Sequence, residues 1–317
     1  MSGLASQRPG FVGKVPDRAE YLPVPTTAPG FAALDAWLSS SMEWAAGHAG
    51  ASFPNAFASG AMQGFVFCDG VTMASALVGA LAPSHDSAGR QFPLAFALPV
   101  ALDASLLEKP ELLPFVFEDL WAVSTDALSA RLAGNAAGVD ALLTTLESLA
   151  APELGETQQL YASWAAELPQ AELWTLLGLQ TDPQLALRWL LETLAPLKGA
   201  PRTSSGLSLR VPLGALGGIG LCFWLDLVRR SLAWTSGVPS MFWSHDGSTG
   251  TAFIHPGRLP KPTLAELWLP TGERDEIADL TQPLSDDVAL QLAPLPAPIQ
   301  AALSVNCRVD ALLAAVG

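Results

Sequence analysis

The chain has 317 residues, of which 50% are hydrophobic and 15% are charged. This composition supplies enough apolar surface for a substantial core and excludes a disordered chain. The formal net charge of −14 argues against a nucleic-acid binder, because Lys and Arg are sparse and form no basic cluster that could displace counterions from a polyanion.

Cysteine usage and hydropathy indicate a cytoplasmic protein. Cys68, Cys222 and Cys307 are far apart and odd in number, so they predict free thiols rather than a disulfide framework or a thiolate zinc site. Met1 to Pro16 lack the apolar segment of a secretory signal. The apolar run from Val211 to Leu225 is shorter than the about 20 residues that cross a bilayer. We therefore expect no membrane insertion.

The N-terminal part of the chain predicts strands around a single helix. The helix follows from apolar residues that recur at spacings of three and four, and the strands are short apolar runs beside turn signals such as Asp69-Gly70. A polar loop at residues 83–91 separates the last two strands. In chain order we expect a strand at residues 11–15 within a Gly- and Pro-rich arm (1–30), a helix at 31–48, and strands at 63–68, 75–81 and 92–98.

Residues 103–195 change in character, because Leu and Ala dominate and β-branched residues become rare. We expect three or four amphipathic helices there, the last of them starting at Thr181-Asp182-Pro183. A linker at residues 198–206 follows. Beyond it we expect a strand at 207–212, a helix at 214–232, a hairpin of strands 240–244 and 251–255 across Asp246-Gly247, a helix at 263–269, and a helical end at 298–316.

Strands therefore precede and follow a helical block, which predicts an α/β fold with one sheet built from both flanking regions. The predicted domain spans residues 1–272, with the helical insertion at about 103–198. Residues 273–317 are predicted to form an acidic, Pro/Leu-rich C-terminal tail with a short terminal helix. Three glycines at chain reversals, Gly13, Gly89 and Gly247, are expected to adopt positive φ. Five large apolar residues of the motif segments are expected to bury one sheet face: Phe11, Phe92, Leu94, Phe242 and Trp243.

Common catalytic and cofactor motifs are absent from the sequence, including the G-x-S-x-G elbow and the phosphate-binding P-loop. Residues 214–220 weakly resemble a dinucleotide fingerprint, but Ser240 stands where an acidic residue is needed. His245, Asp246 and His255 could meet across the hairpin, although a turn explains His245-Asp246 better than a metal site does. We expect no metal, no cofactor and no enzymatic activity.

His85, Asp86 and Arg90 form the most suggestive polar cluster, in a loop between two apolar strands. The loop either displays functional groups or is shaped by an Asp86–Arg90 pair, with Gly89 supplying an unusual backbone angle. No base–nucleophile pair with a third orienting group can be assembled from the sequence. The pattern therefore favours the structural interpretation of this cluster.

Three segments share a further pattern: residues 9–18 (PGFVGKVPDR), 83–94 (PSHDSAGRQFPL) and 239–260 (PSMFWSHDGSTGTAFIHPGRLP). Together, in this order and spacing, they resemble the TagF/ImpM family of type VI secretion accessory proteins over about residues 9–270. The second segment is the most specific match, with His85 standing where the family tends to have Val.

The resemblance implies a three-layer α/β/α sandwich with a mixed sheet. It also implies a cytoplasmic protein that represses type VI secretion assembly post-translationally by binding a forkhead-associated scaffold protein. The candidate partner-binding residues are His85, Asp86, Arg90, Lys14 and Arg18. Two alternatives stay open: an enzyme, either a hydrolase or a phosphate-handling activity, that uses the His85–Arg90 loop, and a structural subunit of the secretion apparatus.

Overall fold

Strands from both ends of the chain form one mixed sheet. The computed structural model describes residues 8–25, 29–68, 75–149, 153–199, 206–235, 237–269, 276–304 and 307–317. The strands in these residues are β1 (Gly10–Gly13), β2 (Gln63–Phe67), β3 (Ser75–Ala82), β4 (Leu94–Ala101), β5 (Ser208–Pro212), β6 (Ser240–His245), β7 (Gly250–His255) and β8 (Ile277–Asp279).

The sheet order brings the N-terminal and C-terminal strands side by side. It runs β1-β4-β3-β2-β6-β7-β5-β8, and the described neighbours pair antiparallel except β5 with β8. At the centre, β2 pairs with β6, so that Gly64 lies opposite Trp243. The prediction of one sheet built from both regions that flank the helical block is confirmed.

One face of the sheet is covered by α1 (Pro29–His48), α2 (Phe53–Ala58) and α11 (Pro262–Glu266). The recurrence at spacings of three and four places Phe31 and Leu38 on one side of α1, where both are 0% exposed. Burying each such side chain stabilises the fold by about 1.5–3 kcal/mol, and this explains why the predicted helix forms here.

The opposite face is covered by the inserted block and by α10 (Gly217–Ser231). Asp182 caps the last long helix of the block by accepting from the N–H groups of Gln184 and Leu185, as its position before Pro183 predicts. The block has more helices than the three or four predicted, because Pro and Gly residues interrupt it. They are α3 (Ala104–Glu108), η1 (Pro110–Leu112), α4 (Leu113–Val116), α5 (Glu118–Leu132), α6 (Ala136–Ser148), α7 (Leu154–Glu167), α8 (Gln170–Leu177), α9 (Pro183–Leu194) and η2 (Ala195–Leu197).

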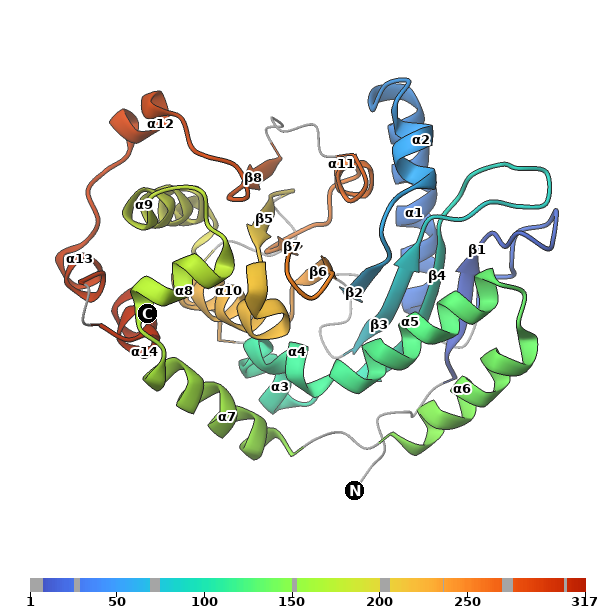
Figure 1. The fold of residues 1–317 in the computed structure, drawn as a ribbon, viewed down its shortest axis with the longest axis horizontal. Helices are drawn as coiled ribbons and strands as arrows, with labels where there is room; N and C mark the ends of the chain where they lie inside the picture. The colour runs from blue at the N-terminus through green and yellow to red at the C-terminus, as the bar shows by residue number, and fades with distance from the viewer. Residues whose placement is uncertain are drawn as a thin grey trace.

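The helices and the sheet form three layers. Helix α5 packs on β3 and β4 from one side, and α1 packs on the same part of the sheet from the other (Figure 1). The predicted three-layer α/β/α sandwich with a mixed sheet and an inserted helical block is confirmed.

The prediction that the five large apolar residues of the motif segments share one sheet face is wrong. Phe11, Leu94 and Trp243 pack on the side of the inserted block, whereas Phe92 and Phe242 pack on the side of α1. Phe242 and Trp243 are neighbours in β6, and successive side chains of a strand point to opposite faces.

The described residues of the C-terminal segment, for which the sequence predicts a tail, contact the rest of the fold. Strand β8 extends the sheet through its parallel pairing with β5, and Val309 and Leu312 are 0% exposed in the core of the inserted block. Two short helices replace the single helix expected at residues 298–316. The helices of this segment are α12 (Asp286–Gln291), α13 (Ala297–Ala302) and α14 (Val309–Val316).

The apolar run of Val211 to Leu225 divides between β5 and α10, both of which are buried. Within the described ranges, the helices are too short or too polar to cross a membrane. The expected Asp69-Gly70 turn and residues 200–205 of the predicted linker lie outside the described residues.

Candidate functional site

The predicted polar loop is organised around the Asp86 carboxylate, which is fully buried. Its Oδ1 accepts hydrogen bonds from the backbone N–H groups of Ala88 (3.0 Å) and Arg90 (2.9 Å). Its Oδ2 lies 2.7 Å from Arg90 Nε and 3.1 Å from Lys14 Nζ. Four donors therefore surround one carboxylate, and two of them carry positive charge.

Burial by itself raises the pKa of Asp86, but the hydrogen bonds from Arg90, Lys14 and Ala88 outweigh burial and hold this pKa well below its usual range. The group is therefore an ionised anchor near neutral pH and does not exchange protons there. A carboxylate in this state organises a loop and is unsuited to act as a general acid or base.

The same loop fastens the N-terminal arm to the sheet. Arg90 Nη2 donates to the Ala19 carbonyl (2.9 Å), and the Ser87 N–H donates to the Arg18 carbonyl (2.8 Å). Gly89 closes the turn with a φ of 79°, a conformation that glycine adopts without strain. The first two sequence motifs, although distant in the chain, thus form one structural unit.

The structure brings together Lys14, Asp86 and Arg90, and it places the other two candidate residues at the surface beside them. The side chains of His85 and Arg18 are exposed, and the Arg90 side chain is 64% exposed despite its two bonds. The predicted Asp86–Arg90 pair is confirmed. A role of these residues in binding a partner stays a prediction.

The hairpin histidines do not meet. In the β6–β7 register His245 pairs with Gly250 and His255 pairs with Ser240, so the two rings lie at opposite ends of the hairpin. Asp246 accepts hydrogen bonds from the backbone of Ser248 and Thr249, which is the turn role that the sequence favours. Among the described residues, no group of His, Cys, Asp and Glu side chains could hold a metal ion.

His255 belongs to a buried polar cluster under α11. Its Nδ1 lies 2.9 Å from Ser208 Oγ, which in turn lies 3.1 Å from Thr263 Oγ1. Burial lowers the pKa of His255 to about 3. The ring is therefore neutral at physiological pH, and it is too deeply buried to reach a substrate.

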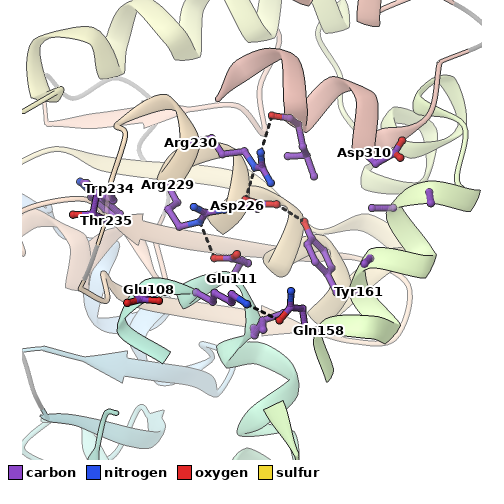
Figure 2. Close-up of a pocket in the computed structure, with 16 residues that line it drawn as sticks. Glu108, Glu111, Gln158, Tyr161, Asp226, Arg229, Arg230, Trp234, Thr235 and Asp310 are labelled. Atoms are coloured by element: carbon purple, nitrogen blue, oxygen red, sulfur yellow. Dashed lines mark hydrogen bonds and ion pairs between the residues drawn. The ribbon is translucent and has the colours of Figure 1, made fainter. Parts of the chain in front are cut away.

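A pocket of about 780 Å³ opens between η1, α7, the end of α10 and α14 (Figure 2). Arg229 lies between two buried carboxylates: its Nε is 2.9 Å from Glu111 Oε2, and its Nη2 is 2.6 Å from Asp226 Oδ1. Arg230 Nε is 2.7 Å from the same Asp226 oxygen. The Tyr161 hydroxyl points at Asp226 Oδ2 from the opposite wall, at 3.4 Å.

The two carboxylates of this pocket have different environments. Burial and the nearby Asp226 charge raise the pKa of Glu111, and Arg229 opposes this rise only in part. Asp226, in contrast, forms ion pairs with the guanidinium groups of both Arg229 and Arg230. A buried carboxylate with a raised pKa in an open pocket is a typical feature of a binding or catalytic site.

Sequence reasoning missed this pocket, because Glu111 and Asp226 come from distant parts of the chain and meet only when α10 packs on η1. One signal was present. Asp226, Arg229 and Arg230 follow an apolar run at helical spacing, so one turn of α10 carries three charges beside buried residues.

Comparison with known proteins finds a family match for the N-terminal part of the chain. Residues 10–149 match the family described as TagF N-terminal domain, type VI secretion system-associated. None of the curated proteins matches the chain. The crystal structure of PA0076 from Pseudomonas aeruginosa PAO1 is 17% identical, with a TM-score of 0.46, over 84% of this chain and 96% of that chain. The predicted resemblance to the TagF family is confirmed over residues 10–149, the part of the chain that matches the type VI secretion-associated TagF N-terminal domain.

Proposed function

We propose that this protein represses the assembly of a type VI secretion system by binding a component of its scaffold in the cytoplasm. The proposal is carried by one observation: within the residues that match the TagF N-terminal domain, the most specific motif forms a loop that is held around buried Asp86 and leaves His85 and Arg90 at the surface. A forkhead-associated scaffold protein, the partner that the family resemblance implies, is the proposed target.

The geometry of the loop supports binding over catalysis. Asp86 is the carboxylate of the cluster, and it is buried and engaged by four donors, so it cannot take a proton from a substrate near neutral pH. His85 Nδ1 lies 2.9 Å from the carbonyl oxygen of Asp86 and has no acidic side chain to orient it among the described contacts. The loop therefore lacks the base and orienting group that the enzyme alternative requires.

The exposed side chains define the proposed contact surface. Arg90 is held by Asp86 and Ala19, and its guanidinium is oriented before a partner arrives, which reduces the entropy lost on binding. Arg18 adds a second exposed cation beside it. Planar guanidinium groups suit carboxylates and backbone carbonyls as acceptors, so the partner surface is expected to be acidic or to expose carbonyl oxygens.

Overproduction in a cell with an active type VI system tests the proposal. Secretion should fall, and the forkhead-associated scaffold should co-purify with the tagged protein in modest amounts. Arg18→Glu should relieve repression and reduce capture, because it reverses an exposed charge at the contact surface. Lys198→Glu makes the same change in net charge beside α9, far from this surface, and should leave both unchanged.

Two results would contradict this function. Undiminished secretion at high protein levels would remove the repressor role. Recovery of the protein as an integral part of a large assembly would favour the alternative of a structural subunit.

A further inference from the structure

The connection between α12 and α13 is an extended segment at the surface of the protein. It consists of residues 292–296, with the sequence LAPLP, and it runs along the outer edge of the molecule between the two helices (Figure 1). It belongs to the Pro/Leu-rich region that the sequence singles out after residue 272, and it lies outside the TagF N-terminal match. The proposed contact surface around Arg90 does not include it.

The two ends of this segment have polyproline II dihedral angles. Leu292 has a φ of −78° and a ψ of 138°, and Pro296 has a φ of −53° and a ψ of 141°. An ideal polyproline II helix has a φ of about −75° and a ψ of about +145°. Between the ends, the ring of Pro294 fixes its own φ, and Ala293 and Leu295 are restricted to extended conformations because each precedes a proline. The sequence therefore favours the same helix throughout the segment.

The exposure of the side chains follows the period of that helix. A polyproline II helix has about three residues per turn, so residues three apart lie on one side of it. Leu292 and Leu295 are half-buried, and Leu295 packs against the core of the inserted block. The residues between and after them are exposed: Ala293, Pro294, Pro296 and Ala297. One side of the helix thus lies on the protein, and two sides face outward.

Helix α9 holds the inner side of the segment in place. Arg188 donates from Nε to the Ala293 carbonyl (2.8 Å) and from Nη2 to the Leu292 carbonyl. Glu192, one turn later in α9, accepts a hydrogen bond from the Ala293 N–H. The segment is therefore positioned before a partner arrives, which reduces the entropy lost on binding.

The outward sides combine apolar surface with free backbone acceptors. Pro294 and Pro296 are exposed, and Leu290, two residues before the segment, is 85% exposed. The carbonyl groups of Pro294 and Leu295 accept no hydrogen bond from the residues that the structure describes. An apolar surface made of neighbouring residues is more informative than a single exposed apolar side chain.

Two kinds of protein surface can bind an exposed extended segment. A partner strand needs N–H groups from it, but Pro294 and Pro296 have none, and the Ala293 N–H is bonded to Glu192. A groove lined by aromatic rings binds polyproline II helices through their proline rings and carbonyl groups, and both are free here. The segment therefore suits an aromatic groove and is unsuited to strand addition.

We propose that residues 290–296 are a docking segment for a partner protein that holds a polyproline II helix in a groove lined by Trp and Tyr rings. The rings of Pro294 and Pro296 pack between these aromatic side chains. Indole N–H or phenol O–H groups of the groove donate to the carbonyls of Pro294 and Leu295, and Leu290 contacts apolar surface at one end of the groove. This docking does not depend on the proposed repression, so the partner need not be the forkhead-associated scaffold.

Photo-crosslinking of the full-length protein in the cells that produce it tests the proposal. With p-benzoylphenylalanine in place of Ala297, an exposed residue directly after the segment, the protein should crosslink to one partner through a peptide that contains Trp or Tyr. The same group in place of Ala137, exposed on α6, should not capture that partner. In the lysate, the peptide acetyl-ALQLAPLPAP-amide (residues 289–298) should compete for the partner, and the same peptide with alanine at each proline should not.

Variants measure the contribution of the exposed side chains. Pro294→Ala combined with Pro296→Ala should lower the crosslink yield by roughly fivefold or more, because alanine removes the ring contacts and loosens the preformed helix. Pro54→Ala, an exposed proline in the first turn of α2, is the matched control and should leave the yield unchanged. Leu290→Ala should lower the yield by roughly two- to threefold, and Leu160→Ala, exposed on α7, should not.

Thermal melts show that a lost crosslink is not a lost fold, because these substitutions leave the contacts of Arg188 and Glu192 with the backbone intact. Three results would overturn the proposal: no crosslink from position 297, a crosslink to a second copy of this chain, or a yield that neither the double proline variant nor the competing peptide lowers. Each would leave the segment as a stiff spacer between α12 and α13.

Discussion

Lys14 Nζ lies 3.1 Å from Oδ2 of the fully buried Asp86, and this ion pair joins the arm after β1 to the loop between β3 and β4. It links the two motif segments by which the TagF domain is recognisable in the sequence. Because the carboxylate has no access to water, its partners in the protein replace its hydration.

Asp86→Asn should lower the melting temperature by several degrees. The substitution keeps the shape of the side chain but removes the charge that compensates the partly buried Lys14, and leaving one member of such a pair alone is strongly destabilising. The measurement is thermal unfolding followed by circular dichroism. Lys14→Met with Asp86→Asn should recover part of the loss, and a double variant less stable than either single variant would contradict the pairing.

Arg90→Ala separates bracing from partner contact. The side chain is 64% exposed, so solvent screening limits the stability that its ion pair supplies, and we expect the melting temperature to fall by no more than roughly 2–4 °C. Capture of the scaffold should be lost. If the loss of scaffold capture in Arg90→Ala and Arg18→Ala is proportional to the loss of melting temperature, Arg90 only stabilises the loop. If neither capture nor secretion changes, this loop has no role in the proposed function.

Gly13→Ala should destabilise the fold by about 3 kcal/mol or more. Gly13 has a φ of 123°, and a Cβ there would lie 1.9 Å from the Pro93 carbonyl oxygen, so the strand pair β1–β4 would have to separate. Chemical denaturation measures the loss. Gly47→Ala is the matched control: no atom lies within 4 Å of its added Cβ, it has no positive φ, and it lies in α1, where alanine should stabilise by about 0.5–1 kcal/mol.

Sequence patterns predicted the structure correctly where the contacts are between residues close in the chain. The Asp86–Arg90 pair spans one turn, Gly89 has the predicted positive φ, and the hairpin across Asp246-Gly247 follows from adjacent residues. The pairing of Lys14 with Asp86 depends on how elements that are distant in the sequence pack together, and so does the pocket at Glu111. Local sequence periodicity does not predict such packing.

Short elements were missed for a related reason. Strand β8 has three residues, too few to show an alternating pattern, and it exists because it pairs with β5. Its position is further held by Arg210, whose Nη1 lies 3.0 Å from Asp279 Oδ2. Helix α2 has six residues and buries only Phe53 and Phe57, so tertiary contacts rather than intrinsic propensity stabilise it.

His255 should make the stability of the protein depend on pH. Burial holds its pKa at about 3 in the folded chain, whereas an unfolded histidine titrates near 6.5. Between these values the unfolded chain binds a proton that the folded chain does not, so the free energy of unfolding should decrease as pH falls below about 6.5. The expected slope is about 1.4 kcal/mol per pH unit, and it should continue until pH approaches 3.

His255→Asn isolates this contribution, because an amide can bond to Ser208 in place of Nδ1 but does not titrate. Urea unfolding of both proteins between pH 7 and 5 is the measurement, since that window lies above the titration of most carboxylates. His48, His85 and His245 are exposed and present in both proteins, so their effects cancel in the comparison. As the pH falls, the free energy of unfolding of the wild type should decrease more steeply than that of the variant, by about 1.4 kcal/mol per pH unit. Parallel curves would show that His255 is not the buried neutral group that the structure indicates.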